Sequence, residues 1–245
     1  MLGVRVNAIQ IPGAIAAMED WIRFRTCTHF VAVTGMHGVV EAQHQPLFKT
    51  ILGEADLVVP DGMPLVWMGR WHGFGMRRRV YGPELMETFF KTTGSRYNHF
   101  LYGGAPGVAD LLANKMRNRY GIRIAGTYSP PFRKLTPDEE QEVIRMIQST
   151  SPDVLWVGLS TPKQEHWMWS FRSRLSVPVM VGVGAAFDFH TGRTKQAPVW
   201  MREHGLEWFF RLASEPRRLW RRYLIYGSQF VWNVNLEILG LKKFN

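Results

Sequence analysis

The chain has 245 residues, of which 46% are hydrophobic and 20% are charged, a balance that excludes a disordered protein and predicts a sizeable core. The 30 Lys and Arg residues and the 20 Asp and Glu residues give a net charge of +10, which favours nucleic acid, phosphorylated substrates or an anionic bilayer as partners. Cys27 is the single cysteine, so an intrachain disulfide is excluded and a reducing compartment is expected.

Targeting and membrane-spanning segments are not evident in the sequence. Residues 1–10 hold one Arg and lack the apolar stretch of a signal peptide. No window reaches the about 18–20 uncharged apolar residues that a membrane-spanning helix needs. We therefore expect a cytoplasmic protein that does not cross the membrane, with a charge that suits a peripheral position on its inner face.

Strand-like and helix-like segments alternate through the first 190 residues. Six short apolar runs predict strands: His29–Thr34, Asp56–Pro60, Asn98–Tyr102, Ile122–Tyr128, Asp153–Leu159 and Val177–Val183. Helices are predicted between them, including a single helix over Val39–Leu52 and helices that open at Pro83 and Pro137. This alternation predicts an α/β fold over residues 1–192, a Rossmann-like parallel sheet with helices on both faces.

The composition changes after Gly192. Residues 193–245 hold ten Lys and Arg residues against four Glu residues, together with many aromatic side chains. No further strand followed by a glycine turn occurs in this part. We therefore predict a basic, aromatic-rich helical appendage over residues 193–245 that faces a membrane.

Asp61 lies at the junction of a predicted strand and a predicted helix. Leu57–Val59 is a short apolar run that suits a strand buried on both faces. Pro60 ends this run, and Pro64 fits the first turn of a following helix. Open α/β sheets bind ligands at this edge, so Asp61 is a candidate functional carboxylate. The alternative is that Asp61 caps the helix that begins at Met63.

Polar residues and glycines follow the other strands as well, and in a parallel sheet they fall on the same edge. They are Thr34, Gly103, Gly104, Lys163, Gln164 and Asp188. The glycine-rich turn suits an anion, although a tight turn alone would require the same glycines. Helix caps at Thr34 and Asp188 and a solvated Gln164 are the structural alternatives. Together these positions predict a cleft with a base, polar donors and an anion-binding turn.

Patterns for metal-dependent or covalent catalysis are absent from the sequence. H-E-x-x-H, paired cysteines, Asp-x-Asp and G-x-S-x-G do not occur. His37 and His44 lie seven residues apart, and two histidines at this spacing do not make a ligand set by themselves. We therefore expect neither a resident metal ion nor a cofactor.

Four arginines, Arg217, Arg218, Arg221 and Arg222, are spaced so that one helix gathers them on one side. A solvated charged face is the structural alternative. Pro216 begins the helix, aromatic residues are interleaved, and no Glu is expected as a partner. This composition favours phosphate binding or a bilayer interface.

Seven motifs stand in order along the chain: Asp61–Pro64, Gly103–Gly107, Val157–Glu165, Gly182–Asp188, Ala197–Met201, Gly205–Leu212 and Glu215–Tyr223. Over residues 7–223 this set resembles the WecG/TagA/CpsF glycosyltransferases, family 26. The resemblance implies an inverting transferase that moves a sugar from a UDP-sugar to a polyprenyl-diphosphate-linked saccharide. It further implies a reaction without a metal ion, in bacterial cell-surface polysaccharide synthesis.

The resemblance also implies roles for individual residues. Asp61 is similar to the general base that deprotonates the acceptor hydroxyl, and Thr34 and Gln164 are similar to residues near the reacting sugar and the leaving phosphate. Donor binding is expected of Gly103, Gly104, Phe132, Pro162, Lys163, Gln164, Gly184 and Asp188. Of these, Asp188 resembles the residue at the uracil. The acceptor diphosphate is expected at Arg217, Arg218, Arg221 and Arg222.

Two positions depart from the family pattern. Met36 stands where the family usually has Asn, and Gln196 replaces the usual Arg before Ala197. An inactive member that serves as a scaffold in a polysaccharide assembly complex is therefore the alternative to an enzyme. A nucleic-acid-binding module is a further alternative from charge alone, although no nucleic-acid motif accompanies the charge. The donor sugar, the acceptor sugar and homo-oligomer formation stay open.

Overall fold

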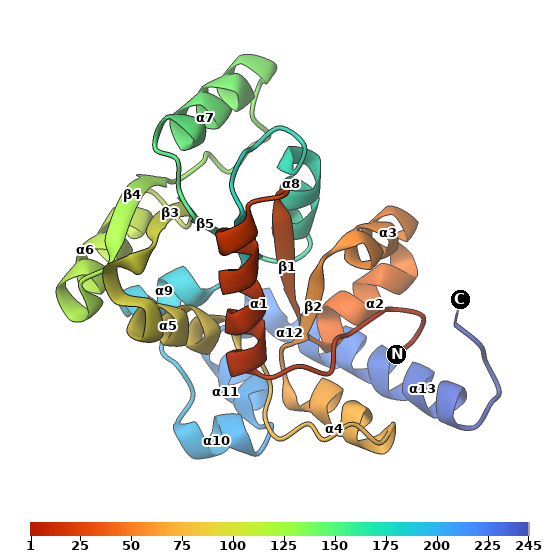
Figure 1. The fold of residues 1–245 in the computed structure, drawn as a ribbon. Helices are drawn as coiled ribbons and strands as arrows, with labels where there is room; N and C mark the ends of the chain where they lie inside the picture. The colour runs from red at the N-terminus through yellow and green to blue at the C-terminus, as the bar shows by residue number, and fades with distance from the viewer. Residues whose placement is uncertain (245) are drawn as a thin grey trace.

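Six parallel strands form one sheet in the computed structural model of the protein, which describes residues 1–244 (Figure 1). The strands are β1 (His29–Thr34), β2 (Leu57–Pro60), β3 (Asn98–Gly103), β4 (Arg123–Tyr128), β5 (Val154–Gly158) and β6 (Val179–Gly182). Their order across the sheet is β2-β1-β6-β5-β3-β4, and every neighbouring pair is parallel. The carboxyl ends of all strands therefore meet at one edge of the sheet.

Apolar side chains on both faces of the strands hold the helices against the sheet. In β1, Val31 and Val33 pack on one face, and Phe30 and Ala32 pack on the other, as the two-residue repeat of a strand requires. One face is covered by α1 (Ile11–Phe24), α5 (Gly82–Thr93), α6 (Val108–Tyr120) and α9 (Ala186–Thr191). The opposite face is covered by α2 (Met36–His44), α3 (Pro46–Glu54), α7 (Pro137–Ser149) and α8 (Lys163–Phe171).

The ends of β1 and β2 approach each other closely, which determines the position of Asp61. The Asp61 N–H donates to the Thr34 carbonyl oxygen at 2.8 Å. A Cβ atom on Gly35 would lie 2.5 Å from the Asp61 carbonyl oxygen, so only glycine fits there. Gly62, with φ +119°, then turns the chain into α4 (Met63–Trp71). The backbone thus holds Asp61 at the ligand-binding edge of the sheet.

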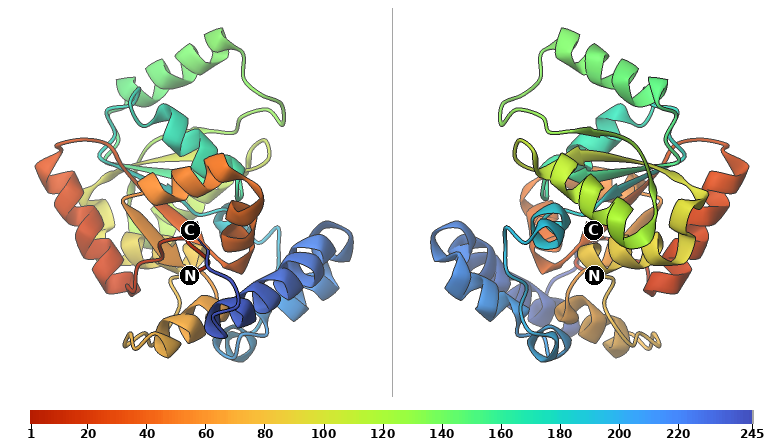
Figure 2. Two further views of the ribbon diagram at one scale, coloured as in Figure 1. Left: turned by 90° about the vertical axis from the view of Figure 1, so that its right-hand side faces the viewer. Right: turned by 90° about the vertical axis from the view of Figure 1, so that its left-hand side faces the viewer.

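The C-terminal segment consists of helices that pack against this same edge. They are α10 (Val199–Glu203), α11 (Glu207–Ser214), α12 (Pro216–Trp220), the π-helical turn η2 (Arg221–Ile225) and α13 (Tyr226–Ile238). α13 packs along α2, and its Phe230 and Val234 are buried in the core that also contains β1 and β5. Figure 2 shows these blue helices on one side of the molecule. The boundary expected at residue 192 stays a prediction.

The α/β architecture and the helical C-terminal segment predicted from the sequence are confirmed. The single helix expected over Val39–Leu52 is wrong, because α2 ends at His44 and α3 begins at Pro46. The proline ring cannot continue the helical hydrogen-bond ladder, and Gln45 adopts an extended backbone before it. Within residues 1–244, no helix is both long enough and apolar enough to cross a bilayer.

Candidate functional site

Asp61 follows β2 and lines a cavity at the edge of the sheet, called the Asp61 cavity below. Gly62 occupies the N-cap position of α4, and no side-chain hydrogen bond caps this helix. The interpretation of Asp61 as a helix cap is therefore wrong. Its carboxylate instead faces charged side chains from the C-terminal segment and from the loop before α5.

The Asp61 cavity has a volume of about 90 Å³ and is closed on one side by α11 and η2. Two carboxylates, those of Asp61 and Glu207, line it. Three arginines, Arg79, Arg211 and Arg222, line it as well. The charged side chains therefore carry a net charge of +1 when both acids are ionised. Such a wall suits an anionic group placed next to a base.

Burial is the main influence on the Asp61 carboxylate and raises its pKa from 3.8 to about 6. The positive charge of Arg79 opposes this rise in pKa, and the negative charge of Glu207 reinforces it. A carboxylate with a pKa near 6 is more basic than an ordinary Asp, yet most of it is ionised at neutral pH. Asp61 is therefore suited to accept a proton from a bound hydroxyl group.

The cationic part of the cavity wall consists of arginine. Burial lowers the pKa of the Arg222 guanidinium, which still stays charged at neutral pH. Arg79 forms an ion pair with Glu207, and its guanidinium carbon lies 4.2 Å from the ring centroid of Tyr81. Burial lowers the pKa of His37, also on the wall, to about 3, so this histidine is neutral. The positive charges that face Asp61 are thus independent of pH in the physiological range.

The four arginines of the C-terminal cluster do not share one environment. Arg222 lines the Asp61 cavity, whereas Arg217, Arg218 and Arg221 are exposed. Arg218 pairs with Glu215 at 2.8 Å, so the expectation that no Glu accompanies the cluster is wrong. The π-helical turn η2 interrupts the regular helical spacing on which the prediction of one shared side depended. A role at a diphosphate stays a prediction for all four.

Gln164 and Thr34 lie buried near the carboxyl ends of β5, β6 and β1. The Gln164 side-chain amide donates to Glu165 Oε1 at 3.0 Å and accepts from the Gly184 N–H at 2.9 Å. The interpretation of a solvated Gln164 is therefore wrong. Thr34 is fully buried, and its Oγ1 has no hydrogen-bond partner among the described residues. Neither side chain lines the Asp61 cavity, so their roles near the reacting sugar stay predictions.

The glycine turn after β3 uses its backbone for packing. The Gly104 N–H donates to the Gly158 carbonyl oxygen at 3.1 Å, and a Cβ atom on Gly103 would lie 2.5 Å from the same oxygen. The φ angles of +133° at Gly103 and +75° at Gly104 also require glycine. The tight turn therefore accounts for both glycines, and the Gly104 N–H already donates to the Gly158 carbonyl oxygen rather than pointing freely toward an anion. Donor binding by this turn stays a prediction.

The remaining donor-site candidates are distributed along the same edge. Phe132 is 87% exposed in the loop between β4 and α7. Pro162 and Lys163 stand at the start of α8, with the Lys163 side chain exposed. Asp188 lies within α9, where its carboxylate is 3.7 Å from the Arg193 guanidinium. No three His, Cys, Asp or Glu side chains of residues 1–244 come together as a metal site.

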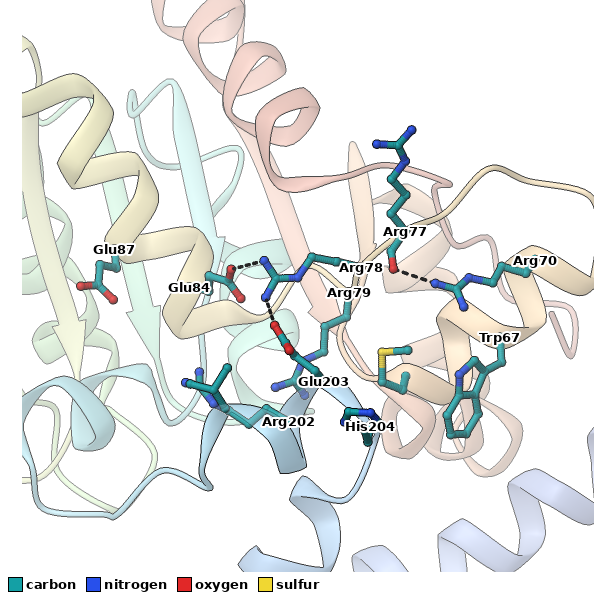
Figure 3. Close-up of a pocket in the computed structure, with 12 residues that line it drawn as sticks. Trp67, Arg70, Arg77, Arg78, Arg79, Glu84, Glu87, Arg202, Glu203 and His204 are labelled. Carbon is teal, nitrogen blue, oxygen red and sulfur yellow. Dashed lines mark hydrogen bonds and ion pairs between the residues drawn. The ribbon is translucent and has the colours of Figure 1, made fainter.

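A second, larger cavity adjoins the Asp61 cavity and is called the arginine cavity below (Figure 3). Its volume is about 650 Å³, and it lies between α4, the loop before α5, α5 itself and α10. Its charged lining residues are Arg70, Arg77, Arg78, Arg79, Arg202, Glu84, Glu87 and Glu203. Arg79 and Met63 line both cavities, so the two are direct neighbours.

The sequence matches a known protein family along almost its whole length. The family described as "Glycosyl transferase WecG/TagA/CpsF family" matches residues 1–244. The chain belongs to this family. It is accordingly a glycosyltransferase, and the resemblance carried by the seven motifs is confirmed.

Two relatives of this WecG/TagA/CpsF glycosyltransferase carry the name N-acetylglucosaminyldiphosphoundecaprenol N-acetyl-beta-D-mannosaminyltransferase. The protein from Bacillus spizizenii is 33% identical over 186 residues, which cover 75% of this chain and 70% of that protein. The protein from Bacillus subtilis is 31% identical over 176 residues, which cover 71% of this chain and 66% of that protein.

Sequence reasoning misses several residues that face Asp61 in this glycosyltransferase. They are Arg79, Tyr81, Glu207 and Arg211. Two signals point to three of them: the unbroken arginine run 77–79 in front of a helix, and the i, i+4 spacing of Glu207 and Arg211 on one helix. Met36, a departure from the family pattern, also lines the Asp61 cavity.

Proposed function

We propose that the protein transfers an N-acetylmannosamine-type sugar from a UDP-sugar to a polyprenyl-diphosphate-linked N-acetylglucosamine, with inversion at the anomeric carbon. The names of the two Bacillus relatives support both sugars and the lipid-linked acceptor. The product then serves the synthesis of a bacterial cell-surface polysaccharide. The reaction takes place on the inner face of the membrane, with the protein in the cytoplasm.

The observation that carries the proposal is the desolvated Asp61 carboxylate, with its pKa raised to about 6, opposite three arginines. Asp61 accepts the proton of the acceptor hydroxyl as its oxygen attacks the anomeric carbon of the donor. The bond from that carbon to the diphosphate breaks, and UDP leaves with the bonding electron pair. A single displacement of this kind places the new bond on the opposite face of the sugar and so inverts the anomeric centre.

Negative charge grows on the diphosphate as it leaves. The guanidinium groups of Arg211 and Arg222 are suited to stabilise this negative charge, because both line the Asp61 cavity and remain cationic. Fixed donors in a partly buried site stabilise such charge more strongly than solvent-exposed donors do. We propose that arginine side chains perform this task and that transfer proceeds in excess EDTA.

The C-terminal segment is part of the catalytic site in this proposal. α11 contributes Glu207 and Arg211 to the Asp61 cavity, and η2 contributes Arg222. Exposed aromatic side chains of the same segment, such as Trp220 and Trp232, suit the level of lipid headgroups. The segment would thus close the site and bring it to the inner leaflet, where the acceptor lies.

A panel of donors tests the proposal. UDP-ManNAc, UDP-ManNAcA, UDP-glucose and UDP-GlcNAc are each incubated with a short-chain prenyl-diphosphate-linked GlcNAc, with and without excess EDTA. We expect a β-linked product from UDP-ManNAc alone and no loss of rate in EDTA. UDP binding without turnover on any donor would contradict the proposal and favour the inactive scaffold, for which the apolar Met36 in the cavity wall is the specific observation.

A further inference from the structure

The arginine cavity holds positive charge that the protein does not neutralise. Glu84 and Glu203 both pair with Arg78, at 3.7 Å and 2.9 Å (Figure 3). The third acid of the cavity, Glu87, pairs instead with Arg119, which is not among the lining residues. Two of the three acids therefore neutralise the same arginine of the cavity, and the third neutralises an arginine outside it.

Three of the five arginines of the cavity, Arg70, Arg77 and Arg202, have no acidic partner among the described residues. Arg70 is held in place by the backbone, since its Nε donates to the Met76 carbonyl oxygen and its Nη2 to the Arg77 carbonyl oxygen, both at 2.7 Å. Arg202 has a buried Nε with no hydrogen-bond partner. A buried guanidinium N–H without an acceptor is unfavourable, so this atom indicates that a ligand supplies the acceptor.

Exposed aromatic side chains lie on the elements that form the arginine cavity. Trp67 lines the arginine cavity and is half-exposed, and Trp71 and Phe74 follow it on α4 and the adjoining loop. Trp200, on α10, is 58% exposed next to the cavity-lining Val199. Tryptophan beside arginine is typical of surfaces that sit at the level of lipid headgroups. α4 and α10 lie at one end of the molecule, opposite α7 (Figures 1 and 2).

We propose that the arginine cavity binds the phosphate group of a lipid. Arg70 and Arg202 donate to the phosphate oxygens, because a guanidinium fork matches phosphate geometry. Trp67 lies against the apolar part of the same lipid. This site is separate from the C-terminal arginine cluster, and it adds a contact with the membrane at α4 and α10 to the one proposed for the C-terminal segment.

Two lipids offer this chemistry: an anionic phospholipid of the bilayer and the polyprenyl diphosphate of the acceptor. Only the second rests on the proposed function. It is geometrically consistent, because Arg79 lines both cavities and an acceptor with its hydroxyl at Asp61 would extend directly into the arginine cavity. The experiment below separates the two lipids by composition, and it requires no turnover.

Vesicle co-sedimentation of the full chain tests the site. The vesicles contain phosphatidylcholine alone, phosphatidylcholine with phosphatidylglycerol, or phosphatidylcholine with a polyprenyl diphosphate. Arg202→Gln is compared with Lys195→Gln, a control that removes one positive charge from an exposed position seven residues earlier in the chain, outside the lining of both cavities. Arg145→Gln, on the exposed side of α7, is the distant control.

We expect Arg202→Gln to weaken binding to at least one of the two anionic vesicles, relative to phosphatidylcholine alone, by about fivefold or more, and the two controls to stay within about twofold. A loss confined to polyprenyl diphosphate assigns the cavity to the acceptor, and a loss confined to phosphatidylglycerol assigns it to the bilayer. The affinity of Arg202→Lys for the vesicles should fall between those of wild type and Arg202→Gln, because lysine keeps the positive charge but lacks the two parallel N–H donors of a guanidinium group. Equal binding by Arg202→Gln and Lys195→Gln on all vesicles would overturn the proposal, because diffuse charge would then explain the attraction.

Discussion

The two neighbouring cavities, which share Arg79, differ in how their charges are balanced. In the Asp61 cavity, two carboxylates and three arginines nearly cancel within about 90 Å³, and burial raises the pKa of Asp61. In the arginine cavity, about 650 Å³ in volume, Arg70, Arg77 and Arg202 have no acidic partner among the described residues. The small, balanced cavity suits the transfer of a proton at one atom, and the large, unbalanced one suits the binding of an anion.

The largest expected effect comes from Asp61→Asn, which removes the proposed base and keeps the shape of the side chain. We expect turnover to fall by about 10²–10⁴-fold, the usual contribution of a general base. UDP affinity, measured by calorimetry, should be unchanged, since the substitution leaves the donor-site residues in place. Turnover close to that of wild type would remove Asp61 from the mechanism.

The same substitution should stabilise the fold above neutral pH. The pKa of Asp61 is raised from 3.8 to about 6 on folding, so ionisation of its carboxylate disfavours the folded state as pH rises through this range. Above pH 7 we expect the Asp61→Asn variant to be more stable than wild type by about 2–3 kcal/mol, from 1.36 kcal/mol per unit of pKa. Near pH 3.5 the difference should vanish. Denaturant unfolding at both pH values measures it, and a gain independent of pH would contradict the assigned burial.

A smaller effect is expected from the arginine that enters the Asp61 cavity. Arg222→Gln removes a cation near the reacting groups, whereas Arg221→Gln removes the same charge from the adjacent, exposed position. We expect kcat/KM to fall by about 10- to 100-fold for Arg222→Gln, the value of a charge-assisted hydrogen bond. Arg221→Gln should stay within about twofold, as exposed charges contribute little. Equal losses in the two variants would place the function of the cluster outside the cavity.

These point substitutions are more informative than a truncation of the C-terminal segment. Removing the chain after Leu212 deletes Arg222, but it also removes Phe230 and Val234 from the core of the protein. Loss of two buried apolar side chains from a close-packed core destabilises it by several kcal/mol, on the order of 2–5 per residue. A truncated protein would therefore confound catalysis with folding.

Local patterns in the sequence are sufficient to predict the strands of the sheet, although not their order across it. Each strand is a short apolar run bounded by turn residues, as Leu57–Val59 is bounded by Pro60. Such a run can be recognised without knowing which distant residues it contacts. The error over Val39–Leu52 has the same origin, because apolar spacing continues across Pro46 while the helix does not. The position of Asp61 followed from the end of a strand, which is also a local feature.

The partners of Asp61 are not predictable in this way. Glu207 and Arg79 come from distant parts of the chain and meet only because α11 folds back over the sheet edge. Arg221 and Arg222 lie in the π-helical turn η2 and Arg217 and Arg218 lie in α12, a change of helix type that no spacing rule anticipates. Gly103 and Gly104 suited an anion site in the sequence, but the structure shows a close approach to Gly158. Tertiary packing decides each of these cases.

The most direct test of the central claim is the pH dependence of kcat/KM in wild type and in two variants with opposite charge changes. If Asp61 is the base, the wild-type rate rises through pH about 6, the pKa of its carboxyl group. Glu207→Gln removes a negative charge that raises the pKa of Asp61, so the rise should move to lower pH. Arg79→Gln removes a positive charge that lowers this pKa, so the rise should move to higher pH. A rise at the same pH in all three proteins, or at the ordinary value of an Asp, would contradict the proposed role of Asp61.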